Sequence, residues 1–408
     1  MKKDFLAVIL GTDVNAYGMA RSVHIAYDEK SLCVGKGRLM MTADSKICDV
    51  DVIYSQTDEA FISELINKAI KLKENYQQLI LFPASDVYSE LIVNHEEQLK
   101  EHFLIPLPNM NLFNQMKLKE EFYKLCDSHK LPYAKTIIAE SHNYEEQSKK
   151  LIVPLVIKPS NSITYTDLDF PGKKKAFIVN QAAEVLPILK SIYETGYQEP
   201  MIIQDFIPGD DTNMRVLNSY SNQQGEVLKL SMGQPLLEDV TPFLIGNYVA
   251  IINNQDKEAC LKFKAFLENS QYTGFANFDM KYDSRDQTFK VFEINMRLGR
   301  SSFFSTAFGS NLLQAAIEDL VYNRPSTELF ENKEEQMLWL GVPKEVAETY
   351  VTDPVLQAVV KECISKDAVV NTLTYNKDKS FMRNRKINKY YQSYVDRYKE
   401  YFKEKGEI

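Results

Sequence analysis

Three features that would indicate other classes of protein are missing from this 408-residue sequence. Its five cysteines include no CxxC pair, which argues against a zinc site or a disulfide framework and for a reducing compartment. The formal net charge is −8, so no overall attraction to nucleic acid is expected. No apolar run approaches the roughly 20 residues that a membrane-spanning helix needs. A globular cytoplasmic protein without a transmembrane segment is therefore the default interpretation.

The length is too great for one ordinary hydrophobic core, so two or three domains are expected. An apolar strand at 5–10 runs into a glycine and an aspartate before a helix, which is how an open α/β sheet places a ligand at its carboxyl edge. Helical periodicity at 58–73 and a strand at 78–82 follow. Residues 1–110 are therefore predicted to form a small α/β domain.

The rest of the chain mixes both kinds of element. We predict helices over 112–128, 256–269 and 311–322, and strands over 151–158, 201–207 and 289–295, with further short strands between 214 and 282. Residues 160–177 are predicted to be a mobile loop or a hairpin. A second domain over 111–330 and a C-terminal helical extension over 331–408, ending in a Tyr- and Lys-rich helix, complete the predicted organisation.

One stretch near the middle of the chain gathers acidic, amide and guanidinium side chains. On a strand, Glu293, Asn295 and Arg297 share one face because side chains alternate. Asp279 and Lys281 likewise share a face of the preceding strand. If the two strands pair, their carboxylate and amide oxygens form a site suited to Mg²⁺ held together with phosphates. An ordinary polar sheet face with cross-strand ion pairs is equally consistent with this stretch alone.

Other residues are candidates for binding a nucleotide. Lys158 closes an apolar strand, where it could either extend into solvent or contact phosphate. Lys119 on an amphipathic helix, and Lys174 in a basic flap after Gly172, have solvated alternatives. The stretch QDFIPGDD could offer backbone groups to adenine and an aspartate to ribose, or could be a plain turn after a strand.

An amino-acid substrate needs cationic and anion-binding groups. Arg300, Ser301 and Ser302 follow the metal-type strand and could bind carboxylates together with a helix N-terminus, although a simple turn is the alternative. Arg21 is a further candidate, with a surface arginine as the alternative. The basic segment from residue 383 to the end could dock an anionic substrate or a membrane, but a helix that packs its tyrosines on the body is favoured.

The motifs follow one order over residues 112–325, namely KLKEEFYKLCDSHKLPYAKT, LVIKPSNS, GKKKAF, MIIQDFIPGDD, GFANFDMKYD and FEINMRLGRSS. Together they resemble the ATP-grasp superfamily. Over most of the chain, GTDVNAYGMARS, IPGDDTNMRVLNSY, QPLLEDVTPFLIGNYV and FEINMRLGRSSFF are similar to the bacterial D-aspartate ligase family. The resemblance implies an ATP-grasp fold of the α/β (α+β) class, with an N-terminal pre-ATP-grasp domain, central ATP-binding subdomains and a C-terminal extension.

The resemblance also implies roles for individual residues. ATP would be bound by Lys119, Lys158 and Lys174, by the hinge of Gln204, Asp205, Phe206 and Ile207, and by Asp211 at the ribose. Asp279, Glu293 and Asn295 would hold Mg²⁺, Arg297, Lys281 and Arg300 would act in catalysis, and Arg21, Arg300, Ser301 and Ser302 would bind substrate. Two positions depart from the usual pattern, because the flap has a single glycine and Met296 stands where many members have proline.

The activity implied by the resemblance is ATP-dependent amide formation. The β-carboxylate of D-aspartate would be joined to the lysine side chain of the peptidoglycan precursor UDP-MurNAc-pentapeptide through an acylphosphate, with release of ADP and phosphate. A loop over 160–176 would exclude water as a lid. A ligase with another acceptor, a non-catalytic nucleotide-binding regulator and homo-oligomer formation all stay open, although the complete set of metal-type residues argues against the regulator.

Overall fold

The computed structural model describes residues 2–150, 152–242, 244–331 and 333–402. The chain divides into two compact units. Unit 1 comprises Met1–Met110, Asp210–Phe278 and Asn295–Ile408, and unit 2 comprises Asn111–Gly209 and Asp279–Ile294. The chain therefore crosses between units four times, whereas the predicted division into three consecutive domains stays a prediction. Within the described residues, no helix is long and apolar enough to span a bilayer.

A four-stranded parallel sheet forms the N-terminal part of unit 1. Its order is β3-β2-β1-β4, and the strands are β1 (Lys3–Leu10), β2 (Ser31–Gly35), β3 (Cys48–Val52) and β4 (Tyr76–Pro83). The last six residues of β1 are all buried, which explains why it reads as a continuous apolar run rather than an alternating one. The predicted strands at 5–10 and 78–82 are confirmed.

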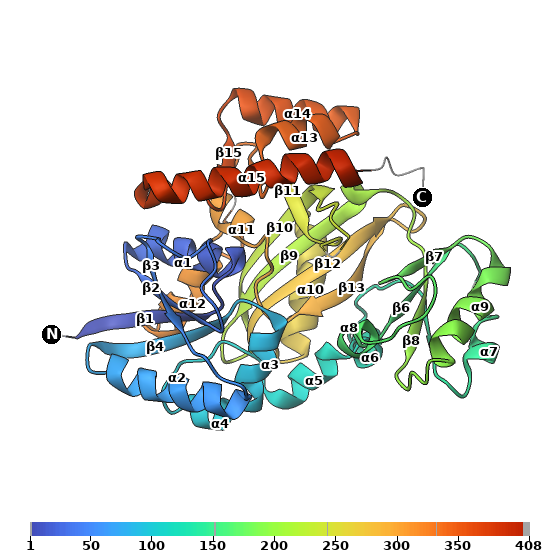
Figure 1. The fold of residues 1–408 in the computed structure, drawn as a ribbon, viewed down its shortest axis with the longest axis horizontal. Coiled ribbons are helices and arrows are strands. Elements are labelled where there is room, and N and C mark those ends of the chain that lie inside the picture. Colours follow the sequence, from blue (N-terminus) through green and yellow to red (C-terminus); the bar gives the residue numbers. More distant parts are fainter. Residues whose placement is uncertain (1, 151, 243, 332, 403–408) are drawn as a thin grey trace. The chain divides into compact units, whose positions relative to one another are not determined.

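Helices cover both faces of this sheet. In Figure 1, α1 (Val14–Tyr27) and α12 (Leu312–Leu320) lie on one face and α2 (Asp58–Leu72) on the other. The short helices α3 (Asp86–Asn94) and α4 (Glu96–Leu99) follow β4. Asp13 caps α1 by accepting a hydrogen bond from the amide of Ala16, so the aspartate after β1 begins the next helix.

The second sheet is mostly antiparallel and has seven strands in the order β13-β12-β9-β10-β11-β14-β15, of which β13 (Thr288–Asn295) belongs mostly to unit 2. Its strands are β9 (Met214–Ser221), β10 (Val227–Glu238), β11 (Tyr248–Ile252), β12 (Gly274–Asp283), β14 (Leu338–Leu340) and β15 (Val369–Asn371). The helices α10 (Lys257–Asn269) and α11 (Phe303–Ala307) belong to unit 1. The C-terminal extension is thus not purely helical as predicted, since β14 and β15 pair with this sheet.

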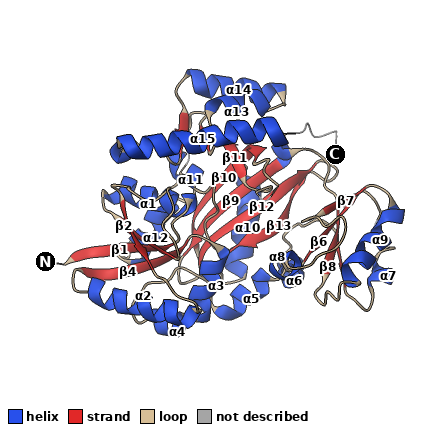
Figure 2. Ribbon diagram, in the orientation of Figure 1, coloured by secondary structure: helices blue, strands red, loops and turns tan. Residues whose placement is uncertain are grey.

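Three helices of the extension lie on one side of that sheet in Figure 2, namely α13 (Lys344–Tyr350), α14 (Pro354–Ser365) and α15 (Phe381–Tyr401). The apolar layer between them includes Leu237, Val249 and Leu340 from the sheet and Tyr394 and Tyr398 from α15. Both tyrosines are buried. The favoured interpretation of the basic Tyr-rich segment, a helix that packs tyrosines on the body, is therefore confirmed for α15, while residues 403–408 lie outside the described part.

Unit 2 contains an antiparallel sheet of order β5-β8-β6-β7. Its strands are β5 (Thr136–Ala139), β6 (Leu155–Pro159), β7 (Phe177–Val179) and β8 (Met201–Asp205), and its helices are α5 (Met110–Lys117), α6 (Lys119–His129), α7 (Tyr144–Gln147), α8 (Ser162–Thr166) and α9 (Ala182–Tyr193). The predicted helix over 112–128 is split at Leu118, whose backbone is extended. The predicted loop over 160–177 contains the short helix α8.

Residues 279–294 add a hairpin to unit 2, formed by the end of β12 and most of β13 (Thr288–Asn295). Arg285 in its turn forms ion pairs with Asp205 at 2.6 Å and with Asp283 at 2.7 Å. Lys290 also contacts Asp283 at 2.6 Å. These contacts hold the pKa of Asp283 far below its usual range, chiefly through the Arg285 hydrogen bond. They join the hairpin to the end of β8.

A close approach at the start of β12 generates a stability prediction. Gly274 has φ +86°, and a Cβ atom there would overlap the carbonyl of Pro106 and lie 2.8 Å from the amide nitrogen of Leu107. We expect Gly274→Ala to lower the free energy of unfolding by about 3 kcal/mol or more, because backbone strain and steric overlap add. Urea unfolding measures this. Gly196→Ala is the control, since it has φ +87° and no atom within 4 Å, and should cost only about 1 kcal/mol. Equal losses in both variants would show that the overlap relaxes.

Candidate active site

The hairpin carries two of the predicted metal ligands on neighbouring strands. Asp279 lies four residues before the end of β12, and Glu293 lies five residues after the start of β13, its neighbour in the sheet. Residues at similar distances from the turn of a hairpin lie near each other on its two strands. The Glu293 side chain is 44% exposed, so this carboxylate can reach a ligand. The structure therefore brings Asp279 and Glu293 onto the same part of unit 2.

Two lysines lie near Glu293. Lys119 is the first residue of α6, and its ammonium is 3.7 Å from the Glu293 carboxylate and donates to the carbonyl of Ser160. The Lys158 ammonium, on β6, lies 5.4 Å from the centre of the Phe292 ring. Burial, and to a smaller extent the neighbouring Lys119, lower the pKa of Lys158 to about 8 against the opposing effect of Glu293. Lys119 and Lys158 thus both lie near the carboxylate of Glu293.

The predicted adenine hinge lies at the end of β8 in unit 2. The buried Gln204 side chain donates to the hydroxyls of Tyr123 at 2.9 Å and Thr136 at 2.8 Å. The amides of Asp205 and Phe206 donate to the carbonyls of Lys135 and Pro154. Among the described hinge residues, the amide of Ile207 is therefore the N–H group that has no acceptor within the protein. The next residue is a proline and has no N–H to offer.

Lys281 and Lys174 occupy different positions in unit 2. The Lys281 ammonium donates to the carbonyl of Gly209 at 2.6 Å and lies 5.2 Å from the centre of the Phe206 ring, so it contacts the segment that follows β8. Lys174 is exposed in the loop after α8, and its carbonyl accepts a hydrogen bond from Tyr165. Arg285 was missed by the sequence reasoning, and no spacing rule would have linked it to Asp205 eighty residues away.

In unit 1 the predicted ligand Asn295 is oriented by a chain of amides. Its Nδ2 donates to Asn277 Oδ1 at 3.1 Å, Asn277 donates to Asn218 at 2.9 Å, and Asn218 donates to Ser305 at 3.1 Å. The Oδ1 atom of Asn295 accepts a hydrogen bond from Arg297 Nη2 at 3.4 Å. The amide nitrogen thus contacts Asn277, and the carbonyl oxygen, which is the atom a cation would need, faces Arg297.

Arg297 follows β13 and is not part of the strand as predicted, because β13 ends at Asn295. Its guanidinium forms a 2.7 Å ion pair with Asp86 at the first turn of α3. Asn15 of α1 donates to the carbonyls of Ala84 and of Leu298, the residue after Arg297. Both contacts tie the segment after β13 to the carboxyl edge of the parallel sheet.

A pocket lies at that edge, as the pattern of a strand running into glycine and aspartate predicts. Its volume is about 240 Å³, and its lining includes Gly11, Thr12 and Asp13 after β1, Lys36 after β2, and Ala84 and Ser85 after β4. Asp211, the predicted ribose ligand, begins a 3₁₀ turn (Asp211–Asn213) elsewhere in unit 1, directly after Asp210. The structure does not bring Asp211 to this pocket's lining.

The predicted substrate-binding residues have protein partners in unit 1. Arg21 is buried, not a surface residue as the alternative held, and its guanidinium donates to the carbonyls of Asn371, Thr372 and Thr374. Burial lowers its pKa to about 10. Phe303 and Tyr375 flank it, with ring centres 4.4 and 4.5 Å away. Arg21 therefore contacts the segment after β15.

Arg300 donates to the hydroxyls of Tyr390 at 3.1 Å and Tyr394 at 3.4 Å, both on α15. Ser301 and Ser302 are buried, and Ser302 contacts Asn15. The following helix, α11, has five residues, so the helix-dipole argument for an anion site there carries little weight. Arg300 is consequently the member of this group that is best placed to meet a ligand.

Comparisons with known proteins find one similar sequence and several similar structures. No family model matches the chain. A D-aspartate ligase of Enterococcus faecium (strain Aus0004) is 40% identical over 98% of this chain and 97% of its own length. Among solved structures, the ADP complex of an N5-carboxyaminoimidazole ribonucleotide synthetase superposes with a TM-score of 0.61 at 14% identity, and covers 85% of this chain and 84% of that chain. An L-amino acid ligase from Bacillus licheniformis gives 0.58 at 13% identity, with 84% and 81% covered.

The two structural similarities show a shared fold, which is the predicted mixed α/β ATP-grasp fold. The sequence similarity to the D-aspartate ligase is much stronger, because the identity is 40% and extends over nearly the whole of both chains. The predicted family and enzyme class are thus confirmed. The chain belongs to the D-aspartate ligase family of ATP-grasp enzymes and is an ATP-dependent carboxylate–amine ligase.

Proposed function

We propose that this ligase joins the β-carboxylate of D-aspartate to the lysine side-chain amine of UDP-MurNAc-pentapeptide, in the synthesis of peptidoglycan cross-bridges in the cytoplasm. The observation that carries the proposal is the 40% identity with a D-aspartate ligase over 98% of the chain. The acceptor and its pathway come from the family resemblance. The roles of individual residues also come from the family resemblance, and the contacts of some of these side chains support them.

The ATP phosphates are assigned to Lys119 and Lys158. Burial lowers the pKa of Lys158 to about 8, so a nearby anion is needed to keep this lysine charged. Its neighbour Glu293 also pairs with Lys119. A triphosphate supplies the missing negative charge. The hinge over 204–207, through the Ile207 amide, receives adenine, Lys174 approaches the phosphates from its loop, and Asp211 binds ribose.

Mg²⁺ enters with ATP, and we assign it to Asp279, Glu293 and Asn295. The donors fit, because two carboxylates and an amide oxygen are the hard oxygen ligands that Mg²⁺ prefers. The amide chain from Asn277 to Ser305 fixes which atom Asn295 presents. When bound, the ion neutralises charge on the phosphates during transfer.

The reaction then takes two steps. A β-carboxylate oxygen of the amino acid attacks the γ-phosphorus, the bond to ADP breaks, and an acylphosphate forms. The neutral amine of the acceptor attacks the acyl carbon, loses a proton, and expels phosphate to leave the amide. Arg297 steadies the transferred phosphoryl group and the tetrahedral intermediate, and Lys281 and Arg300 are assigned to the same catalytic group. The loop over 160–176 excludes water from the acylphosphate.

The first experiment measures ADP release with Mg·ATP and UDP-MurNAc-pentapeptide in the presence of D-aspartate, L-aspartate or D-alanine. We expect turnover with D-aspartate alone, and only when the nucleotide-linked precursor is present. Turnover with another amino acid or a simpler amine would keep the ligase chemistry and overturn the substrates. Release of AMP and pyrophosphate would overturn the acylphosphate step.

Replacement of Glu293 by Gln tests the metal assignment. The change keeps the shape and removes one negative charge, so we expect kcat to fall by about 10²–10³-fold while the free energy of unfolding changes by less than about 1 kcal/mol. Steady-state kinetics and urea unfolding measure the two effects. Glu258→Gln on α10, where the glutamate is 86% exposed, is the control and should leave kcat unchanged. Undiminished turnover in Glu293→Gln would remove Glu293 from the site.

Replacement of Lys158 by Met tests whether this cation is held for a ligand. The pKa of about 8 lies below the ordinary lysine value of 10.5, so between these pH values the unfolded chain binds more protons and the stability of the wild type rises with pH. We expect Lys158→Met to be more stable than the wild type by about 1–2 kcal/mol at pH 7, to lose that rise, and to bind ATP weakly.

Urea unfolding at pH 7 and pH 9.5 and calorimetric titration with Mg·ATP measure these effects of Lys158→Met. Lys190→Met, at an exposed position of α9 in the same unit, is the control and should change neither quantity appreciably. A destabilised Lys158→Met that still binds ATP would assign Lys158 to the fold rather than to the nucleotide.

A further inference from the structure

Asp239, directly after β10, is buried, and one of its carboxylate oxygens accepts no hydrogen bond from the described residues. Its side chain is 2% exposed, and its Oδ1 accepts from the Thr241 amide at 2.9 Å. Among the described residues, neither Asp239 Oδ2 nor the buried hydroxyl of Thr241 has a hydrogen-bond partner. A buried carboxylate oxygen without a donor is costly, so a donor from outside the chain is indicated.

Tyrosines on one face of α15 contact both Arg300 and the residue that precedes Asp239. Tyr390, Tyr394 and Tyr398 are spaced by four residues and therefore share a side of the helix. Tyr390 and Tyr394 accept from Arg300, and the Tyr398 hydroxyl donates to the carbonyl of Glu238, the residue before Asp239. Arg300 and Asp239 are thus held beside the same helix.

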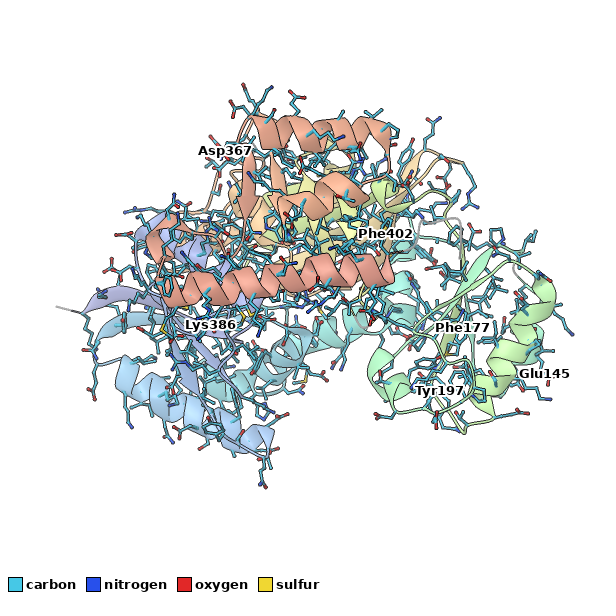
Figure 3. All side chains as sticks on the ribbon, turned by 45° about the horizontal axis from the view of Figure 1, so that its top comes forward. Glu145, Phe177, Tyr197, Asp367, Lys386 and Phe402 are labelled. Atoms are coloured by element: carbon cyan, nitrogen blue, oxygen red, sulfur yellow. The ribbon has the colours of Figure 1, made fainter. Side chains whose placement is uncertain are left out.

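Both ends of α15 are anchored, which fixes the row of hydroxyls. Figure 3 marks the helix with Lys386 near its start and Phe402 just after its end. Lys386 forms a 2.8 Å ion pair with Asp44, and the Phe402 ring lies 4.7 Å from that of Tyr350. The tyrosines therefore belong to a rigid element, which is what a precise binding site requires.

The electrostatics of this group agree with its geometry. Burial raises the pKa of the Tyr394 and Tyr398 hydroxyls, and Asp239 adds to both shifts. Burial lowers the pKa of Arg300, but Tyr394, Tyr390 and Asp239 outweigh it, so the net shift is upward. One permanent cation and one carboxylate, separated by neutral hydroxyls, are thus grouped in unit 1.

We propose that Arg300 and Asp239 bind the headgroup of the donor amino acid, with its α-carboxylate on Arg300 and its α-ammonium on Asp239 Oδ2 and the Thr241 hydroxyl. The inference deepens the proposed function, on which it rests. The paired charges match a zwitterion, whereas a lysine side chain in a peptide carries an amine and no adjacent carboxylate. The substrate side chain, which carries the reacting β-carboxylate, is then the part that remains for phosphoryl transfer.

Tyr390 and Tyr394 act in this scheme as positioning residues, because they orient Arg300 rather than meet the substrate. Arg21, the other predicted carboxylate ligand, already donates to three backbone carbonyls, so the headgroup site does not depend on it. The two charges of the headgroup, the α-carboxylate and the α-ammonium, would each meet one opposite charge of the protein.

The test compares amino acids with the matching 2-hydroxy acids, which lack the ammonium. Calorimetric titrations use D-aspartate and D-malate in the presence of Mg²⁺ and a non-hydrolysable ATP analogue. Asp239→Asn keeps the shape and the Oδ1 acceptor, so we expect it to weaken D-aspartate binding about 10–100-fold and to leave D-malate binding within about twofold. Tyr394→Phe should weaken both ligands alike, since both carry the α-carboxylate.

Asp353→Asn is the control, because Asp353 also accepts from the amide two residues ahead but caps α14. It should change neither ligand. Urea unfolding of every variant separates binding from stability. The assignment would be overturned if Asp239→Asn lost affinity for D-aspartate and D-malate equally. It would also be overturned if this variant bound D-aspartate as tightly as the wild type does.

Failure of the proposed function would look different from failure of this inference. If wild-type protein does not bind D-aspartate, the same variants are titrated with L-aspartate and L-malate, and with D-alanine and D-lactate. Selective loss of the amino acid in either pair would support the headgroup site for another donor. Equal behaviour of the two members of the bound pair would overturn it.

Discussion

A charged side chain can leave water only if the protein or a ligand replaces its hydration, and this constraint governs how the chain is held together. Arg383 and Asp378 form a fully buried ion pair at 3.0 Å. Lys229, which is 2% exposed, pairs with Glu331 at 3.0 Å. Arg21 is satisfied by three carbonyls from the segment after β15. The contacts of Lys229 and Arg21 join segments of unit 1 that lie far apart in sequence, so compensated charges help to hold its elements together.

Charges that the protein compensates incompletely have another use. Lys158 in unit 2 shares its anion with Lys119, and Asp239 in unit 1 keeps one oxygen without a described donor. Both carry a stability cost in the unliganded protein that binding can offset, which is how preorganised sites are usually built. In the proposed function, the triphosphate of ATP and the headgroup of the amino acid supply the charges that match these two positions. Such sites are already desolvated, which would help to keep water from the proposed acylphosphate.

Much of the fold and part of the site could be predicted because they depend on neighbours in sequence. The strand at 289–295 and the carboxylates of the hairpin follow from alternation and from one turn. The break at Leu118 has no glycine or proline to signal it. The network of Arg285 with Asp205, and the amide chain from Asn295 to Ser305, depend on pairing between separate strands, and periodicity does not specify which strands will pair.

The sequence by itself determined the family, the enzyme class and the residue types available for phosphoryl transfer, because ligand chemistry and strand alternation are local properties. Tertiary structure alone decided which protein groups each cation contacts. Arg21 and Arg300 look alike in sequence, yet one donates to carbonyls some 350 residues away and the other meets two tyrosine hydroxyls. It also decided that Asp239 lies buried beside α15, since burial and partnership are set by packing between elements that no spacing rule connects.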